Sequence, residues 1–335
     1  MHSPAIITVL GVGSWGTALA LLLARNGHVV RLWGHDPQEV EPLRRERENR
    51  RYLPGLPFPA ALTVGVDLPA AVAGIDWALV ATPSHAYRMT LERLRPMLPA
   101  NAGLAWATKG LEPGSGRFLH EVAAEILGAS WPVAAISGPS FAGEVARGLP
   151  TAVTVAACDV DYARRAALLL HGSNMRAYTS TDIVGVELGG AVKNVLAIAT
   201  GIADGLGFGA NTRAALITRG LAEMTRLGLA VGGQRETFMG LAGVGDLVLT
   251  CTDDQSRNRR FGLAMGRGET AEAACAAIGQ VVEGAATVRE ALRLARTHGV
   301  EMPITEQVDQ VLHQGQDPRR AVEILLARDL KPETV

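Results

Sequence analysis

The sequence predicts an α/β protein in which a doubly wound, mostly parallel β-sheet is followed by a domain built only of helices. The first half alternates short, uninterrupted apolar runs with helical patterns, as expected for strands that are buried on both faces of a sheet. The second half contains long stretches rich in Ala, Leu and Gly and almost no strand signal. With 335 residues, the chain is long enough for two domains that each bury a core.

The apolar runs place seven strands in the first half, and a further run from Met175 to Tyr178 could add an edge strand. The seven predicted strands cover residues 5–10, 28–33, 61–66, 76–81, 103–106, 132–136 and 150–157. The character of the sequence changes near residues 180–188, inside or just before a long helix. We therefore expect a dinucleotide-binding domain at residues 1–184 and an all-helical domain at residues 185–335.

The composition limits the classes of function. Lys and Arg total 32 against 33 Asp and Glu, so the net charge of −1 provides no basic surface for nucleic acid or an anionic membrane. No stretch approaches ~20 uncharged apolar residues, so we expect no membrane-spanning segment. The three cysteines, Cys158, Cys251 and Cys275, form no C-x-x-C pair, which favours a reduced cytoplasmic protein without a zinc site. The histidines are scattered without ligand spacing, so no metal is expected.

The first strand runs directly into a G-x-G-x-x-G motif at Gly11, Gly13 and Gly16, and an Ala- and Leu-rich helix follows it. This strand–turn–helix context is typical of a Rossmann-type dinucleotide site. The first glycine allows the tight turn, the second lets the backbone approach a pyrophosphate, and the third allows close helix–strand packing. The helix N-terminus attracts the phosphates. A tight turn without a ligand is the alternative.

The end of the second strand bears on the choice between NADP and NAD. Gly34 stands where an NAD enzyme usually carries a carboxylate, so a 2′-phosphate would not be repelled, and His35 could donate to it. Asp36 complicates this interpretation, because a slip of two residues would restore the NAD signature. Asp36-Pro37 can equally form a turn or a helix N-terminus. The sequence favours NADPH and leaves NADH use open.

A lysine follows two adjacent glycines in the first long helix of the second half. Gly189 and Gly190 precede Lys193 by four and three residues and therefore lie beside it on one helix face. Two glycines cost a helix up to about 2 kcal/mol relative to alanine. They are explained if a ligand approaches the backbone next to Lys193. The alternative is a lysine with a buried stem and glycines that serve helix–helix contact.

A polar segment after Asp246 contains Ser256, Arg257 and Asn258, a compact set of donors. The planar guanidinium of Arg257 suits phosphate oxygens. Three arginines within four residues can instead form a solvated basic face, or they can pair with the acids Asp253 and Asp254.

Two strand ends in the first half carry further candidates. Lys109 follows the strand at 103–106, and Gly138 and Ser140 follow the strand at 132–136. Open α/β sheets bind ligands at the carboxyl ends of their strands. Either segment alone could also be an ordinary strand–helix connection.

Taken together, the motifs resemble those of bacterial NAD(P)-dependent glycerol-3-phosphate dehydrogenases, over residues 5 to about 315. The segments that carry the resemblance are residues 11–18, 107–110, 137–140, 190–194, 243–247, 256–258 and 280–284. The resemblance implies a 6-phosphogluconate-dehydrogenase-like fold and the interconversion of dihydroxyacetone phosphate and sn-glycerol 3-phosphate for phospholipid synthesis. Ser140 stands where many relatives have threonine, which keeps the hydroxyl.

The resemblance also implies roles for single residues. It implies cofactor contacts from Ser14, Trp15, His35, Lys109, Ala142, Arg257, Val281 and Glu283, in addition to the three glycines of the turn. It implies substrate contacts from Lys109, Gly138, Ser140, Lys193, Asp246, Ser256, Arg257 and Asn258. Lys193 would be the proton-transfer residue, and the catalytic group would also include Asn194, Lys109 and Asp246. Burial or Lys109 would lower the pKa of Lys193 and Asp246 would raise it, and the sequence leaves the balance open.

The expected partner is a small phosphorylated substrate, with no nucleic acid and no membrane insertion. An alanine-rich helical domain makes a homodimer plausible. Two alternatives remain open. A reductase of the same architecture could act on a hydroxy acid or a phosphorylated sugar acid, in which case Arg257 and Asn258 discriminate. A non-catalytic nucleotide sensor would need the glycine turn but neither Lys193 nor Lys109.

Overall fold

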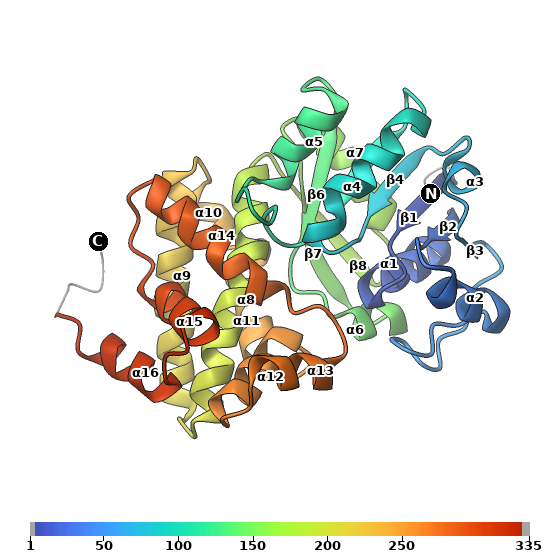
Figure 1. The fold of residues 1–335 in the computed structure, drawn as a ribbon. Coiled ribbons are helices and arrows are strands. Elements are labelled where there is room, and N and C mark those ends of the chain that lie inside the picture. Colours follow the sequence, from blue (N-terminus) through green and yellow to red (C-terminus); the bar gives the residue numbers. More distant parts are fainter. Residues whose placement is uncertain (1–3, 330–335) are drawn as a thin grey trace.

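The computed structural model describes residues 4–329 and places an eight-stranded sheet beside a bundle of helices (Figure 1). The strand order is β3-β2-β1-β4-β5-β6-β7-β8. Strands β1 to β6 are parallel, β7 runs antiparallel to β6, and β8 runs parallel to β7. The predicted doubly wound, mostly parallel sheet is therefore confirmed. The strand order reverses between β1 and β4, and such a switch point opens a crevice at the carboxyl ends of the strands.

The seven predicted strands are present, and the run from Met175 adds an eighth at the edge of the sheet. Their bounds are β1 Ile6–Leu10, β2 Val29–Trp33, β3 Leu62–Gly65, β4 Trp77–Val80, β5 Gly103–Trp106, β6 Val133–Ser137, β7 Thr151–Ala156 and β8 Met175–Ser180. The last strand is two residues longer than predicted, because all six of its residues pair with β7. The central strands β4 and β5 are buried along their whole length, which explains their uninterrupted apolar runs.

Helices cover both faces of the sheet in the first half of the chain. They are α1 Ser14–Arg25, α2 Pro37–Glu46, α3 Leu68–Val72, α4 Ser84–Leu94, α5 Leu119–Leu127, α6 Ala142–Arg147 and α7 Val160–Leu170, with a 3₁₀ turn η1 at Arg95–Met97. Two apolar clusters, one on each face, pack these helices against the strands.

From Ile183 to Leu326 the chain forms helices and no strand. They are α8 Ile183–Gly205, α9 Ala210–Ala230, α10 Arg235–Phe238, α11 Asp246–Thr252, α12 Arg257–Gly266, α13 Ala271–Ile278, α14 Glu283–Thr297, α15 Pro303–His313 and α16 Pro318–Leu326, with a π turn η2 at Leu241–Gly245. Most of them surround α8, which contacts α9, α11, α12, α14 and α15 (Figure 1).

Helix α8 bears on the expectation that no segment of the chain spans a membrane. By length and composition it could cross a membrane, with a mean hydropathy of 1.4 over its most apolar window. However, 89% of that window is buried inside the fold. A helix that is packed on all sides is apolar around its whole circumference, and the enclosing helices of the same chain explain this composition.

The loop between β5 and α5 joins the two halves. It leaves the sheet at Ala107, yet its apolar side chains Leu111 and Phe118 are buried in the core of the helical half. The backbone N–H of Gly114 donates to Glu290 of α14 over 2.9 Å. These contacts fix the loop, and with it Lys109, which lies three residues after the end of β5, relative to the helices.

Candidate active site

Two lysines converge on one buried carboxylate at the junction of the halves. Lys193 of α8 donates to Asp246 Oδ1 over 2.6 Å, and Lys109 donates to Asp246 Oδ2 over 2.7 Å. Lys109 also donates to the carbonyl oxygen of Gly138 over 3.0 Å. Asp246 is only 1% exposed and Lys193 only 6%. The structure thus brings together four predicted site residues from the sheet and from the helices.

The charges of this centre depend on burial and on mutual contact. Burial lowers the pKa of Lys193 to about 8, and the nearby Lys109 adds to this effect, while Asp246 acts against it. Burial alone would raise the pKa of Asp246, but the two ammonium groups lower it overall. Asp246 therefore stays ionised near neutral pH, and Lys193 can both give and accept a proton in that range.

Thr250, which the sequence analysis missed, completes the surroundings of Lys193. Its hydroxyl accepts a hydrogen bond from Lys193 Nζ over 2.9 Å and donates to the carbonyl oxygen of Asp246 over 2.6 Å. Thr250 lies four residues after Asp246 on the same helix, so the i, i+4 spacing was the available signal. The threonine fixes the direction of the amine.

The glycine pair before Lys193 serves the packing of the protein itself. A Cβ atom at Gly189 would lie 2.3 Å from the carbonyl oxygen of Ala242, and one at Gly190 would lie 2.8 Å from Ser137 Oγ. Contact within the chain, the alternative interpretation of the sequence, therefore explains both glycines without a ligand. The glycines let the segment before Asp246 and the end of β6 come close enough for the lysine–aspartate contacts.

The carboxyl ends of β4, β5 and β6 carry hydroxyl groups beside this centre. Ser140 Oγ donates to the carbonyl oxygen of Gly138 over 2.9 Å, and Thr108 Oγ1 donates to that of Thr82 over 2.7 Å. Within residues 4–329, the buried hydroxyls of Thr82 and Ser137 have no hydrogen-bond partner. Buried hydroxyls at strand ends are candidates for ligand binding, and their position after apolar runs was the signal to use.

Of the predicted donor set at 256–258, two side chains are engaged by the protein. Ser256 caps α12 by accepting from the backbone N–H of Arg259 over 3.2 Å. Asn258 Nδ2 donates to Asn194 Oδ1 over 2.9 Å, and Asn258 Oδ1 accepts from the backbone N–H of Gly284 over 2.9 Å. Asn194 thus links α8 to α12 and makes no hydrogen bond to Lys193 among the described residues. These amides tie the helices that surround the site.

Arg257 behaves differently from its neighbours. Its side chain forms no hydrogen bond or ion pair with the part of the chain that the structure describes. Burial lowers the pKa of its guanidinium. Pairing of this segment with Asp253 or Asp254 was the alternative from the sequence, and it is Arg259 that contacts Asp254, over 3.0 Å. Arg259 also contacts Asp204 over 2.5 Å. A half-buried guanidinium with free donors is suited to an anionic ligand.

The glycine turn before α1 fits a dinucleotide. Gly11 has φ = +124°, and a Cβ atom there would lie 2.7 Å from the carbonyl oxygen of Ala81. A Cβ atom at Gly16 would lie 2.0 Å from the carbonyl oxygen of Gly11, whereas one at Gly13 would meet no atom within 4 Å. The fold itself therefore requires the first and third glycines. Only Gly13 leaves its backbone open to a ligand, as pyrophosphate binding needs.

Ser14 and Trp15 begin α1 directly after this turn. The indole Nε1 of Trp15 is buried and has no hydrogen-bond partner in the described chain. A buried donor without a partner calls for a ligand or water, so this side chain also fits a bound cofactor.

The end of β2 supports one of the two interpretations of Asp36. Its carboxylate accepts from the backbone N–H of Gln38 over 2.8 Å and caps α2, so it is a helix N-terminal residue. A side chain at Gly34 would collide with Val40 and Val12, which leaves no room for a carboxylate there. His35 is exposed beside these residues.

The remaining predicted cofactor residues come from α6 and α14. Ala142 is the first residue of α6, Val281 is 41% exposed, and Glu283 begins α14. Glu283 accepts hydrogen bonds from Ser84 of α4, over 2.8 Å from the hydroxyl and 3.3 Å from the backbone N–H. Burial raises the pKa of Glu283. This carboxylate ties the helical half to the edge of the sheet where the glycine turn lies. Residues 4–329 hold no cluster of three or more His, Cys, Asp or Glu side chains that could bind a metal.

Two family models match most of the chain. NAD-dependent glycerol-3-phosphate dehydrogenase N-terminus matches residues 6–163, and NAD-dependent glycerol-3-phosphate dehydrogenase C-terminus matches residues 182–323. The chain belongs to this dehydrogenase family. The resemblance read from the sequence motifs is therefore confirmed.

Individual members of the family are similar over nearly the full length. Glycerol-3-phosphate dehydrogenase (NAD(P)+) of Stenotrophomonas maltophilia (strain K279a) is 58% identical over 98% of this chain and 96% of its own. The enzyme of the same name from Nitrosococcus oceani is 59% identical over 97% of this chain and 94% of its own. The crystal structure of glycerol-3-phosphate dehydrogenase from Coxiella burnetii has a TM-score of 0.94 at 51% identity, and covers 97% of this chain and 99% of that one.

More distant structures share the fold alone with this dehydrogenase family member. A ketopantoate reductase from Ralstonia eutropha JMP134 has a TM-score of 0.61 at 18% identity, and covers 95% of this chain and 99% of that one. A D-mandelate dehydrogenase has a TM-score of 0.63 at 13% identity, and the match covers 95% of this chain and 99% of that one. The same two-part architecture therefore carries other reductases, as the sequence analysis considered.

Proposed function

We propose that this protein interconverts dihydroxyacetone phosphate and sn-glycerol 3-phosphate with a nicotinamide cofactor. The observation that carries the proposal is the Lys193–Asp246–Lys109 centre, in a chain that belongs to the glycerol-3-phosphate dehydrogenases. When bound, the cofactor supplies or accepts the hydride at C2 of the substrate. The residues of the chain then have to bind the phosphate, orient the ketone and move one proton.

Lys193 performs the proton transfer in this proposal. During ketone reduction, its ammonium group donates a hydrogen bond to the C2 oxygen, stabilises the negative charge that develops there and then gives up the proton. During alcohol oxidation, the neutral amine takes the proton from the hydroxyl group. The pKa of about 8 makes both forms accessible near neutral pH. Asp246 and Thr250 hold the amine in one direction through their hydrogen bonds.

Arg257 binds the substrate phosphate in this scheme. Its guanidinium has donors that no described residue uses, and it sits at the first position of α12, where the positive end of the helix dipole favours an anion. Asn258 and Asn194 contribute by fixing α12 against α8. Lys109, Gly138 and Ser140 form the wall of the substrate site at the sheet edge.

For the cofactor we propose NADPH as the preferred form. The packing of Gly34 against Val12 and Val40 excludes an acidic side chain at the end of β2, and Asp36 is engaged as a helix cap. Gly34 has no carboxylate for the ribose hydroxyls of NAD, and the Oδ1 atom of Asp36 already accepts the Gln38 N–H. The exposed His35 can donate to a 2′-phosphate.

We further propose that the product supplies glycerophospholipid synthesis, and that the enzyme acts in the cytoplasm as a homodimer. The three cysteines are free, which suits a reducing compartment. Size-exclusion chromatography with light scattering tests the dimer.

The decisive experiment is an assay of the purified protein with dihydroxyacetone phosphate and NADPH, followed by the loss of NADPH absorbance. We expect turnover in the wild type, and loss of turnover with retained NADPH binding in Lys193→Ala. Arg219→Ala, on the exposed face of α9, is the control that should keep full activity. Absence of turnover in the wild type would reject the proposed reaction, and normal turnover in Lys193→Ala would reject the role of the lysine.

A second candidate is the reduction of a keto acid, because the fold is shared with a ketopantoate reductase and a D-mandelate dehydrogenase. Ketopantoate and benzoylformate in the same assay distinguish the two. We expect little turnover of either, since the free guanidinium of Arg257 suits the dianionic phosphate of the proposed substrate.

A further inference from the structure

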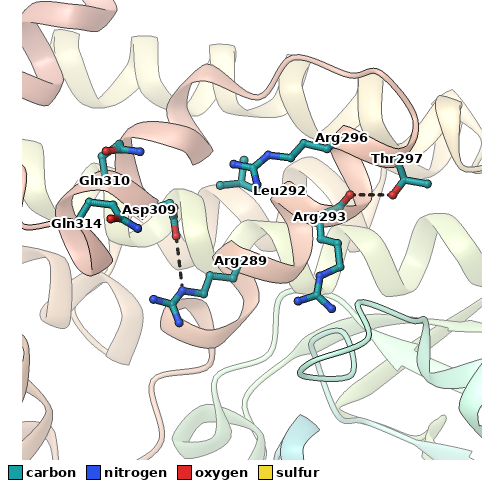
Figure 2. Close-up of a pocket in the computed structure, with 8 residues that line it drawn as sticks. All are labelled: Arg289, Leu292, Arg293, Arg296, Thr297, Asp309, Gln310 and Gln314. Atoms are coloured by element: carbon teal, nitrogen blue, oxygen red, sulfur yellow. Dashed lines mark hydrogen bonds and ion pairs between the residues drawn. The ribbon is translucent and has the colours of Figure 1, made fainter.

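A cavity of about 470 Å³ lies between α14 and α15, apart from the candidate active site. Its volume falls within the range of roughly 300–1,000 Å³ that is usual for small-molecule sites. The side chains that line it are Arg289, Leu292, Arg293, Arg296, Thr297, Asp309, Gln310 and Gln314 (Figure 2). None of these residues belongs to the proposed catalytic or cofactor-binding machinery.

Three arginines give this cavity a positive lining. Arg289, Arg293 and Arg296 are spaced four and three residues apart, so they share one face of α14. Like charges at this spacing destabilise a helix unless a negative group compensates them. Arg293 is engaged, because it donates to the carbonyl oxygen of Gly114. Arg296 has no hydrogen bond or ion pair with any described residue, and Figure 2 shows it lying over Leu292 with its guanidinium toward α15.

Asp309 is the one carboxylate in the cavity lining, and it is an unusual one. The residue is only 9% exposed, and its buried Oδ1 atom has no hydrogen-bond partner among the described residues. Its nearest charged neighbour is Arg289, whose Nε lies 3.9 Å from Oδ1, too far for a hydrogen bond (Figure 2). A buried carboxylate without hydrogen bonds is costly, so it calls for a donor group. Gln310 of α15 and Gln314, the residue that follows this helix, also line the cavity.

We propose that this cavity is a second ligand site, which binds a small molecule carrying both a phosphate group and an amine. The guanidinium groups of Arg289 and Arg296 bind the phosphate, and Asp309 accepts hydrogen bonds from the ammonium group. A simple anion satisfies only the arginines and is repelled by Asp309, whereas a simple amine is repelled by the arginines. The combination of the two groups in one molecule matches the charges of the lining.

Isothermal titration calorimetry on the full chain with bound NADPH tests this site, with O-phosphoethanolamine and inorganic phosphate as the probes. We expect O-phosphoethanolamine to bind more tightly. Arg296→Gln should weaken the binding of both probes about tenfold or more, since it removes hydrogen bonds to a charged group. Asp309→Asn should weaken O-phosphoethanolamine but leave inorganic phosphate equal or tighter, because the repelling charge is gone. Arg219→Gln is the matched control and should change neither affinity.

Three results would overturn the proposal. The first is the absence of saturable binding of either probe. The second is binding that disappears in Arg257→Gln but persists in Arg296→Gln, which would place it in the active site. The third is an equal loss of both probes in Asp309→Asn with unchanged circular dichroism, which would remove the role of the amine. Sedimentation with phosphatidylethanolamine vesicles identifies the source of the phosphate and amine groups. Cosedimentation of the protein that Arg296→Gln abolishes assigns the site to a lipid headgroup. If the wild-type protein does not cosediment, the site is assigned to a free small molecule.

Discussion

Replacement of Asp246 by asparagine tests whether one carboxylate holds the two lysines of the candidate active site. The two contacts measure 2.6 and 2.7 Å, and Asp246 is 1% exposed. A hydrogen bond to a charged group contributes about 1.5–3 kcal/mol, so the two together contribute about 3–6 kcal/mol. Asparagine keeps one acceptor oxygen but turns its N–H₂ toward the other ammonium. We therefore expect the free energy of unfolding to fall by about 3–5 kcal/mol, the usual result of removing one partner of a buried ion pair.

Urea unfolding followed by two signals measures this loss. All five tryptophans lie in the first 131 residues, so their fluorescence reports on the sheet half, while far-UV circular dichroism also reports on the helices. Asp161→Asn, an exposed position in the first turn of α7, is the control and should change stability by less than about 0.5 kcal/mol. A loss below about 1 kcal/mol in Asp246→Asn would refute the reasoning, because it would mean that the carboxylate contributes no more than an exposed pair.

Three further predictions concern pH and the cofactor. The pKa of Lys193 of about 8 predicts that the rate of ketone reduction declines as pH rises through 8, while the rate of alcohol oxidation increases. Initial rates measured in both directions across this pH range check the prediction. If the two rates do not change in opposite directions near pH 8, the assignment of the lysine is contradicted. Gly13→Ala should keep the wild-type melting temperature but weaken NADPH binding, whereas Gly16→Ala should lose about 1–3 kcal/mol of stability because its Cβ collides with Gly11. Thermal unfolding measures the stability of each variant, and fluorescence titration measures its NADPH binding. Equal effects of the two substitutions in both measurements would disprove the distinction. His35→Glu should reduce the ratio of kcat/KM for NADPH over NADH, and an unchanged ratio would remove His35 from 2′-phosphate recognition.

The strands of the sheet could be predicted because each is a short apolar run between turn signals. Strands such as β4 and β5 are buried on both faces, so nothing polar interrupts their sequence. The same uniform burial made α8 harder to interpret. It is surrounded by other helices, and no polar face shows where the chain meets solvent.

The residues of the candidate active site could be predicted more easily than their contacts. Lys193, Asp246 and Lys109 stand out by residue type and by their position in recognisable motifs. The hydrogen bond between Asn194 and Asn258 joins residues 64 positions apart, and no local pattern reveals such a pair. The glycines at 189 and 190 show the same limit. They signalled a close approach correctly, but the sequence does not say whether a ligand or another part of the chain comes close.

The burial of Leu111 and Phe118 among the helices has a consequence for dissection of the protein. A fragment that ends before α8 would expose both side chains to water and would lose the support of Glu290 for the Gly114 amide. Such a truncated sheet unit would be prone to aggregate. The helical half on its own would contain a cavity where Leu111 and Phe118 pack in the full chain. Neither half is therefore a self-sufficient module for recombination with parts of other reductases, unless the β5–α5 loop is redesigned at the same time.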